Sequence, residues 1–270
     1  MQTKTPRRGT IRLTRRGRIA LIATGAAAAA AAVAVPLLLP DDDKRPDTLT
    51  IPEGWRSSQV YTAVDKALDV PAGTTKKALP KADLKLPKDA DGNPEGYLFP
   101  ATYPLSSKST PASVLTYMVN TANKKFGAGQ VTAGADRNAL NVYQSVTIAS
   151  MIEAEAGSKE DMGKVARVIY NRLDRGMPLQ MDSTINYALN RSTLATSERD
   201  TKISSPYNTY ARMGLPPTPI GNPGEEAMRA ANNPSPGDWL YFVTVKPGDT
   251  RFTSDFQEHQ KNVGEFNKAK

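Results

Sequence analysis

The sequence predicts an α+β protein with three parts: a single N-terminal membrane anchor, a small segment that mixes strand and helix, and a larger mixed α+β domain. Residues 19–39 carry no charge, residues 141–156 have the periodicity of a helix, and residues 239–245 (W-L-Y-F-V-T-V) form an apolar, β-branched and aromatic run typical of a strand. The composition is that of a folded chain, because 39% of the 270 residues are hydrophobic and 19 are glycine. Wholesale disorder and collagen-like repetition are therefore not expected.

The excess of positive charge belongs to the N-terminus. Residues 1–18 hold seven of the 35 Lys and Arg residues and none of the 27 acidic residues, so the rest of the chain is close to neutral. The net charge of +8 thus describes a basic tail, and the folded part is not expected to bind nucleic acid.

The uncharged residues 19–39 are predicted to cross a membrane. A helix of this length spans about 31 Å, which matches the hydrocarbon core of a bilayer. A cleaved signal peptide is the alternative, but the length of the stretch and the lack of a clear polar cleavage region favour an uncleaved anchor. The arginines before it then hold the N-terminus in the cytoplasm and place the remainder outside the membrane.

The segment after the anchor is short and mixed. Residues 40–47 (P-D-D-D-K-R-P-D) are polar and flanked by proline, which predicts a linker. Residues 48–51 alternate like a strand, a turn is expected at 52–54, and Ser58 precedes a helical pattern. Residues 72–93 show no period and are predicted to be surface loop.

Three helices are predicted in the C-terminal part. They cover residues 113–125, residues 141–156, and a stretch that begins after Ser158 and is stopped by Gly176. The helix over 141–156 is expected to bury one face.

The remaining C-terminal residues are predicted to be loop and hairpin. Seven prolines between residues 206 and 236 exclude a continuous helix or a central strand, so an ordered loop system is expected there. The strand at 239–245 is followed by V-K-P-G-D-T (245–250), which predicts a hairpin turn.

Composition also limits the chemistry. The chain has no cysteine and a single histidine, His259. This excludes disulfides, iron–sulfur clusters, thiolate zinc sites and cysteine nucleophiles, and it argues against histidine-based metal sites and a Ser-His-Asp triad. No metal and no cofactor are expected, and carboxylates are the expected proton-transfer groups.

Glu153 and Glu155 lie at the end of the predicted helix at 141–156. Two residues apart on a helix, they point about 200° away from each other and cannot form a close pair. If one faces inward beside Ile148 and Ile152, burial should raise its pKa and keep it protonated as a general acid. The alternative is that both are solvated residues at a helix end.

Other polar and aromatic residues could line a sugar-binding cleft, or could simply cap loops and cover the surface. Besides Glu153, the candidates for substrate binding are Asn171, Gln180, Asp182, Thr184, Tyr187, Tyr207, Asn208 and Tyr210.

Several motifs occur in an order that resembles a known family. They are P-E-G-Y-L-F-P-A-T-Y (94–103), A-S-M-I-E-A-E-A-G (149–157), V-A-R-V-I-Y-N-R-L-D-R-G-M-P-L-Q-M-D-S-T (165–184), S-P-Y-N-T-Y with G-L-P-P-T-P-I-G-N-P-G (within 205–224) and Y-F-V (241–243). Together they resemble the MltG/YceG-like family of membrane-anchored endolytic lytic transglycosylases of bacterial peptidoglycan. The resemblance covers roughly residues 94–262. Two positions depart from the family pattern: Ala101 replaces an acidic residue, and Ser183 replaces a proline.

The resemblance implies a mechanism with one catalytic residue. Glu155 matches the second glutamate of the family's E-K-E pattern, which is the catalytic one, and Glu153 matches the first. As general acid, Glu155 would protonate the glycosidic oxygen between MurNAc and GlcNAc, and the C6 hydroxyl of the same MurNAc would attack C1. Glu155 would then accept the proton of that hydroxyl and leave a 1,6-anhydroMurNAc end, an activity suited to ending glycan elongation.

The resemblance also implies an organisation and partners. Residues 94–270 would be the catalytic domain, and residues 48–93 would be a small LysM-like accessory segment. The protein would be a single-pass protein of the cell membrane with its catalytic domain outside. Its partners would be peptidoglycan glycan strands, the membrane, and synthases or division and elongation proteins.

Two alternatives remain open. A hydrolytic muramidase would need a second carboxylate, for which Asp182 and Glu153 are candidates. A non-catalytic peptidoglycan-binding or scaffold protein would use its tyrosines to hold glycan, with Glu155 as a structural residue.

Overall fold

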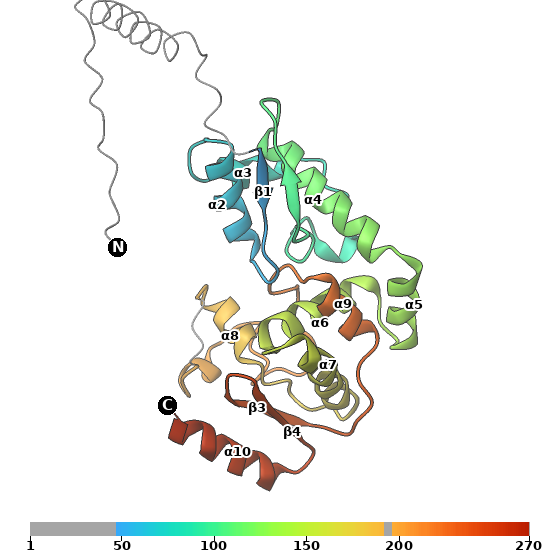
Figure 1. Ribbon diagram of the computed structural model, residues 1–270, viewed down its shortest axis with the longest axis vertical. Coiled ribbons are helices and arrows are strands. Elements are labelled where there is room, and N and C mark those ends of the chain that lie inside the picture. The colour runs from blue at the N-terminus through green and yellow to red at the C-terminus, as the bar shows by residue number, and fades with distance from the viewer. Residues whose placement is uncertain (1–46, 192–195, 270) are drawn as a thin grey trace, which may run out of the picture. The chain divides into compact units, whose positions relative to one another are not determined.

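A computed structural model describes residues 47–191 and 196–269 (Figure 1). The predicted tail (1–18), the predicted anchor (19–39) and all but the last residue of the linker (40–47) lie outside the described residues. Within the described ranges, no helix is both long and apolar enough to cross a membrane. These ranges form nine α-helices and two two-stranded sheets, which confirms the predicted mixed α+β class.

The N-terminal segment is built on an antiparallel strand pair. β1 (Thr48–Thr50) pairs with β2 (Thr102–Pro104), so the segment that begins at residue 48 continues past residue 93. The predicted strand and helix are both present, and α2 (Ser57–Ala67) begins one residue before Ser58. The helix α4 (Pro111–Phe126), which confirms the prediction for 113–125, packs against α2 and α3 (Thr74–Ala78).

The prediction of loop for residues 72–93 was wrong in part. This stretch contains α3 and two short 3-10 helices, η1 (Leu79–Lys81) and η2 (Lys88–Ala90). The buried carboxylate of Asp65 accepts hydrogen bonds from the N–H groups of Gly73 and Thr75 at 2.6 and 2.7 Å, and from the Thr75 hydroxyl at 2.6 Å. A tertiary contact therefore stabilises a helix too short to show a period.

Helix α6 (Val142–Glu155) lies at the centre of the C-terminal part, in contact with α5 (Gly129–Arg137), α7 (Lys159–Asp174) and α9 (Glu225–Asn232) (Figure 1). The helix begins with a capping box: Asn141 Oδ1 accepts from Gln144 N, and Gln144 Oε1 accepts from Asn141 N, both at 2.9 Å. The predicted face is buried, and burial extends beyond it, because every residue from 145 to 152 is buried. Helices on several sides enclose α6, which explains the small residues on its remaining faces.

Local sequence signals predict α7 but not α9. α7 begins after Ser158, whose hydroxyl accepts from Asp161 N, and the chain leaves it through Gly176 at φ +60°, as predicted. The loop predicted for 206–236 is ordered but contains α9. Pro223 and Pro234 lie outside that helix, so neither interrupts its hydrogen bonds.

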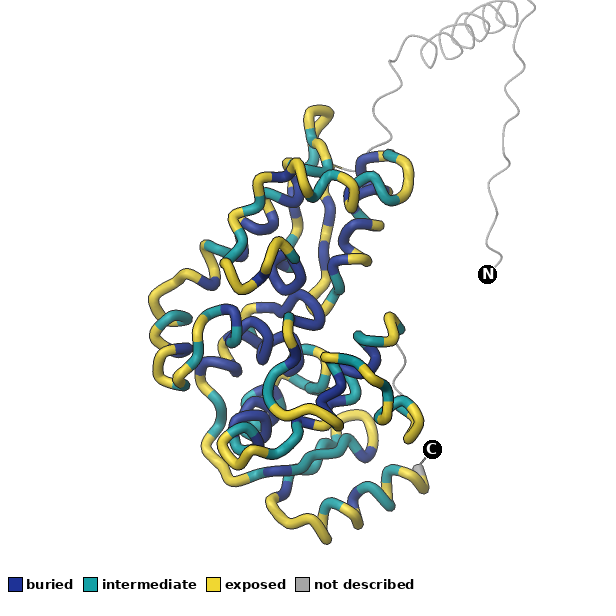
Figure 2. The backbone as a smooth tube through the Cα atoms, turned by 180° about the vertical axis from the view of Figure 1, so that it is seen from behind, coloured by how far each residue is buried: buried dark blue, intermediate teal, exposed yellow. Residues whose placement is uncertain are grey.

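The C-terminus forms a hairpin and a helix. β3 (Tyr241–Lys246) pairs with β4 (Asp249–Thr253) across Gly248 at φ +80°, which confirms the predicted strand and turn. The helix α10 (Phe256–Ala269) packs on β3 and leaves most of its residues exposed (Figure 2). Between α7 and α9 lie α8 (Asp182–Ala188) and the 3-10 helix η3 (Asp200–Lys202).

Candidate active site

Glu155 is the last residue of α6, and its carboxyl group meets the start of α8. Its Oε1 accepts a hydrogen bond from the backbone N–H of Ser183, with N and O 3.0 Å apart. Burial raises the pKa of Glu155, contacts with Ser183 oppose this, and the negative charge of Asp182 raises the pKa further. The Ser183 hydroxyl lies close enough to the carboxyl group to contribute, but it makes no aligned hydrogen bond.

Glu153 points to a different segment, as the helical spacing predicts. Its Oε2 accepts from the N–H of Gly224, which precedes α9, at 3.0 Å. Burial and the charge of Glu53 raise the pKa of Glu153, while the Gly224 hydrogen bond lowers it. The two glutamates therefore serve separate contacts: Glu153 holds the start of α9, and Glu155 faces α8.

Asp182 and Tyr210 are brought together beside Glu155. The Tyr210 hydroxyl donates to Asp182 Oδ1 at 2.5 Å. Burial raises the pKa of Tyr210, and the hydrogen bond to Asp182 and the charges of Asp182 and Glu155 raise it further. Three residues singled out in the sequence, far apart along the chain, thus share one electrostatic environment.

Asn171 and Arg172 are adjacent residues on α7, and Arg172 binds Gln180. Arg172 donates to Gln180 Oε1 at 3.1 Å and to the carbonyls of Leu179 and Leu240 at 2.8 and 2.7 Å. Asn171 Nδ2 donates to the carbonyl of Trp239 at 2.9 Å. These contacts fasten α7 to the chain before α8 and before β3, which fixes the segment that leads to Asp182.

Tyr187 and Tyr207 form an aromatic pair with ring centroids 4.9 Å apart. Both hydroxyls are used inside the protein: Tyr187 donates to Glu95 Oε2 at 3.0 Å, and Tyr207 shares a hydrogen bond with Thr218 Oγ1 at 2.9 Å. Both residues are only partly buried.

Thr184 and Asn208 are enclosed, with 0% of each residue exposed. Thr184 Oγ1 is hydrogen bonded to Thr209 Oγ1, and Asn208 Nδ2 donates to the carbonyls of Thr201 and Ile203. Their side chains organise the loops around α8 and present no surface to a ligand.

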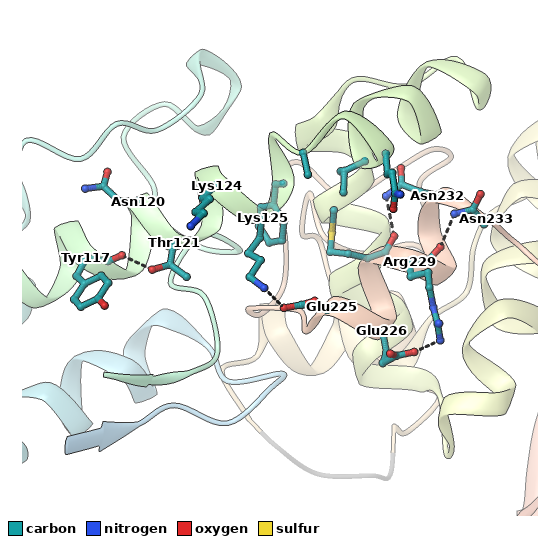
Figure 3. Close-up of a pocket in the computed structure, with 15 residues that line it drawn as sticks. Tyr117, Asn120, Thr121, Lys124, Lys125, Glu225, Glu226, Arg229, Asn232 and Asn233 are labelled. Atoms are coloured by element: carbon teal, nitrogen blue, oxygen red, sulfur yellow. Dashed lines mark hydrogen bonds and ion pairs between the residues drawn. The ribbon is translucent and has the colours of Figure 1, made fainter. Parts of the chain in front are cut away.

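Two cavities in the described part of the chain are not lined by Glu155. One, of about 820 Å³, opens between α4, α5 and α9, where Lys125 reaches Glu225 and Arg229 reaches Glu226 (Figure 3). Another, of about 630 Å³, is lined by residues such as Tyr143 and Leu215. None of the candidate site residues lines either cavity. In the part of the chain that the structure describes, no group of three or more His, Asp or Glu side chains could hold a metal ion.

Comparison with known proteins decides the family. The model of the YceG-like family matches residues 22–265. The chain belongs to the YceG-like family. A crystal structure of a putative YceG-like protein from Listeria monocytogenes is similar to it with a TM-score of 0.71 and 30% identity, over 80% of this chain and 76% of that one.

Two curated relatives carry a functional name. The endolytic murein transglycosylase of Bacillus subtilis is 40% identical over 62% of this chain, and that of Streptococcus pneumoniae is 33% identical over 83%. These matches cover 46% and 45% of the relatives, so the YceG-like chain spans less than half of their length.

Sequence reasoning missed two residues of this region. Arg172 is 6% exposed and Glu95 is 4% exposed, and each gathers several segments through hydrogen bonds. Glu95 lies inside the quoted motif 94–103 and Arg172 inside 165–184, so a search for charged residues within those motifs would have found both.

Proposed function

We propose that this protein is an endolytic lytic transglycosylase that cleaves the bond between MurNAc and GlcNAc in peptidoglycan strands and leaves 1,6-anhydroMurNAc ends. The observation that carries the proposal is the setting of Glu155, whose pKa is raised by burial and by the charge of Asp182. A carboxyl group whose pKa is raised is suited to general acid catalysis. The names of the two curated relatives support the same reaction.

One carboxyl group serves both halves of the reaction. Protonated Glu155 gives its proton to the glycosidic oxygen as the bond from C1 to that oxygen breaks. The C6 hydroxyl of the same MurNAc then bonds to C1, and its proton returns to the Glu155 carboxylate. No water is consumed, and an intramolecular attack of this kind has an effective molarity of up to about 10⁵ M or more.

A hydrolytic muramidase is the second candidate. Because the Glu153 carboxylate binds the N–H of Gly224, Asp182 is the better placed second carboxylate for hydrolysis.

The ends of the products test the proposal. Purified full-length protein in detergent is incubated with peptidoglycan, and the fragments are analysed by mass spectrometry. We expect anhydro-ended fragments from within the strands. Reducing ends would replace the proposal with the muramidase, and binding without cleavage under all conditions would replace it with the scaffold protein.

We further propose that residues 19–39 anchor the protein in the cell membrane and that the segment from residue 48 is a LysM-like accessory unit. The N-terminus is then cytoplasmic, and the catalytic domain lies outside beside peptidoglycan synthesis. Synthases and division or elongation proteins are the corresponding partners, and cleavage there ends glycan elongation.

The N–H of Ser183 is expected to set the alkaline limit of cleavage. Ser183→Pro removes this donor at a position in the first turn of α8, where proline fits a helix. Without the hydrogen bond to its charged form, the pKa of Glu155 rises, so the acid stays protonated to higher pH. The alkaline limb of kcat/KM should move upward by about one pH unit.

Ser183→Ala is the matched control for this prediction, because it removes the hydroxyl and keeps the N–H. Because the hydroxyl makes no aligned hydrogen bond to the carboxyl group, a smaller shift is expected for it. Equal shifts in the two variants would assign the effect to the side chain instead.

A further inference from the structure

Helix α8 contacts two glutamates, one near each end. In its first turn Ser183 donates its N–H to Oε1 of Glu155 at 3.0 Å. In its last turn Tyr187 donates its hydroxyl to Oε2 of Glu95, also at 3.0 Å. With seven residues the helix is about 10 Å long. The two contacts therefore hold both ends of one short, rigid element.

Glu95 itself is tied to a separate part of the chain. It is 4% exposed, and its Oε1 accepts from the N–H of Ser57, the first residue of α2, at 2.9 Å. Asn222 Nδ2 donates to the same oxygen at 3.4 Å. Burial raises the pKa of Glu95, but every hydrogen-bond partner is a donor and favours the carboxylate. A carboxylate there can hold α2 and α8 at once.

Arg56 reinforces this connection. Its guanidinium lies 5.1 Å from the centre of the Tyr187 ring, and its Nη2 donates to the carbonyl of Arg191, just after α8, at 2.8 Å. The positive charge of Arg56 also lowers the pKa of Glu95, which stabilises the carboxylate. The end of α8 is therefore held by a cation and an anion that both come from the N-terminal segment.

We propose that Glu95 is a positioning residue for the proposed transglycosylase reaction: through Tyr187 it holds α8 where the N–H of Ser183 meets the carboxyl group of Glu155. The inference rests on the proposed function of Glu155. Glu95 does not touch the reacting atoms. It connects the segment that begins at β1 to the catalytic acid through one helix.

Tyr187→Phe removes one oxygen atom and the hydrogen bond to Glu95. We expect the rate of cleavage to fall about tenfold and KM to stay within twofold of the wild-type value. The reason is that small displacements of a catalytic group slow the chemical step. The alkaline limb should also move to higher pH, since a looser Ser183 N–H stabilises the Glu155 carboxylate less. Asp182 and Tyr210, the titratable groups that face Glu155, are unchanged in this variant.

Glu95→Gln tests the same contact from its other side. The amide of glutamine has one acceptor oxygen, whereas the carboxylate binds its donors with two. Glu95→Gln should therefore change the rate and the pH profile in the same direction as Tyr187→Phe. In the double variant, the two losses should not add, because both act on one hydrogen bond. Additive losses would overturn the proposal.

Tyr103→Phe is the matched control. The Tyr103 hydroxyl is buried and donates to the carbonyl of Phe99 at 2.5 Å, so this variant also loses one buried tyrosine hydrogen bond, but away from α8. It should lower stability without moving the pH profile. A similar loss of rate and a similar pH shift in this variant would show that the effect of Tyr187→Phe is general destabilisation.

A measurement that needs no activity separates the two proposals. Hydrogen–deuterium exchange of the full-length protein follows the peptide that covers α8. Exchange there should be about tenfold faster in Tyr187→Phe and in Glu95→Gln than in the wild type, and unchanged in Tyr103→Phe. Unchanged exchange of α8 in both variants would overturn the positioning role, whatever the wild type does to peptidoglycan. Absence of anhydro ends from the wild type, with faster exchange in the variants, would instead overturn the proposed function alone.

Discussion

Glu155→Gln is expected to abolish the release of anhydro-ended fragments, with a rate at least about 10³-fold below that of the wild type. Glutamine has the shape of the protonated acid and can accept the hydrogen bond from Ser183 N, but it cannot give a proton to the glycosidic oxygen. The measurement is the time course of fragments by mass spectrometry at the pH of greatest wild-type activity. Glu160→Gln, an exposed glutamate at the start of α7, is the control and should cleave normally.

The same variant should be folded, and its stability should depend on pH differently from that of the wild type. Because the folded protein raises the pKa of Glu155, the protonated acid is favoured by folding and the carboxylate is disfavoured. This contribution is complete below the unfolded pKa and is lost as the pH rises through the folded pKa. Urea unfolding at several pH values should therefore show Glu155→Gln gaining stability relative to the wild type as pH rises. A variant that is equally active, or a difference in stability that falls with pH, would contradict the assignment of Glu155.

Elements with their own local signals were predictable from the sequence. Helix α6 has a complete cap at Asn141 and Gln144, and α7 has Ser158 at one end and Gly176 at the other. Short elements held by distant residues were not. α3 depends on the carboxylate of Asp65. α8 begins just after Gln180, whose φ of +53° is not predicted by its residue type.

The same division holds for the candidate site. The spacing of Glu153 and Glu155 shows that they diverge, and the family resemblance favours Glu155, because both are properties of one helix and its motif. The approach of Asp182 and Tyr210 depends on the path of the loop from residue 196 to residue 224, which no period describes. The role of Glu95 depends on three segments meeting, so no local pattern contains it.

Asn222→Ala is expected to lower the free energy of unfolding by about 3 kcal/mol. The residue is 0% exposed, and its side chain joins two segments of the N-terminal part: Oδ1 accepts from Leu98 N, and Nδ2 donates to Trp55 O, both at 2.7 Å. Alanine leaves the buried N–H of Leu98 without a partner. It also loosens the loop that leads to Gly224, whose N–H binds Glu153. The measurement is urea unfolding, read from the midpoint at an unchanged m value.

Asn232→Ala deletes the same atoms from another buried side chain. The comparison separates the hydrogen bonds of Asn222 from the packing that any Asn→Ala change removes. Asn232 is 3% exposed, and its Nδ2 donates to Met228 O, a carbonyl one turn earlier in α9. Its other side-chain contact is a long hydrogen bond of 3.4 Å from Ser145. Because the loss of this side chain leaves no backbone N–H without a partner, we expect the free energy of unfolding to fall by about 1 kcal/mol. Equal costs for the two variants would show that lost packing, and not the connection between Leu98 and Trp55, accounts for the stability that Asn222 contributes.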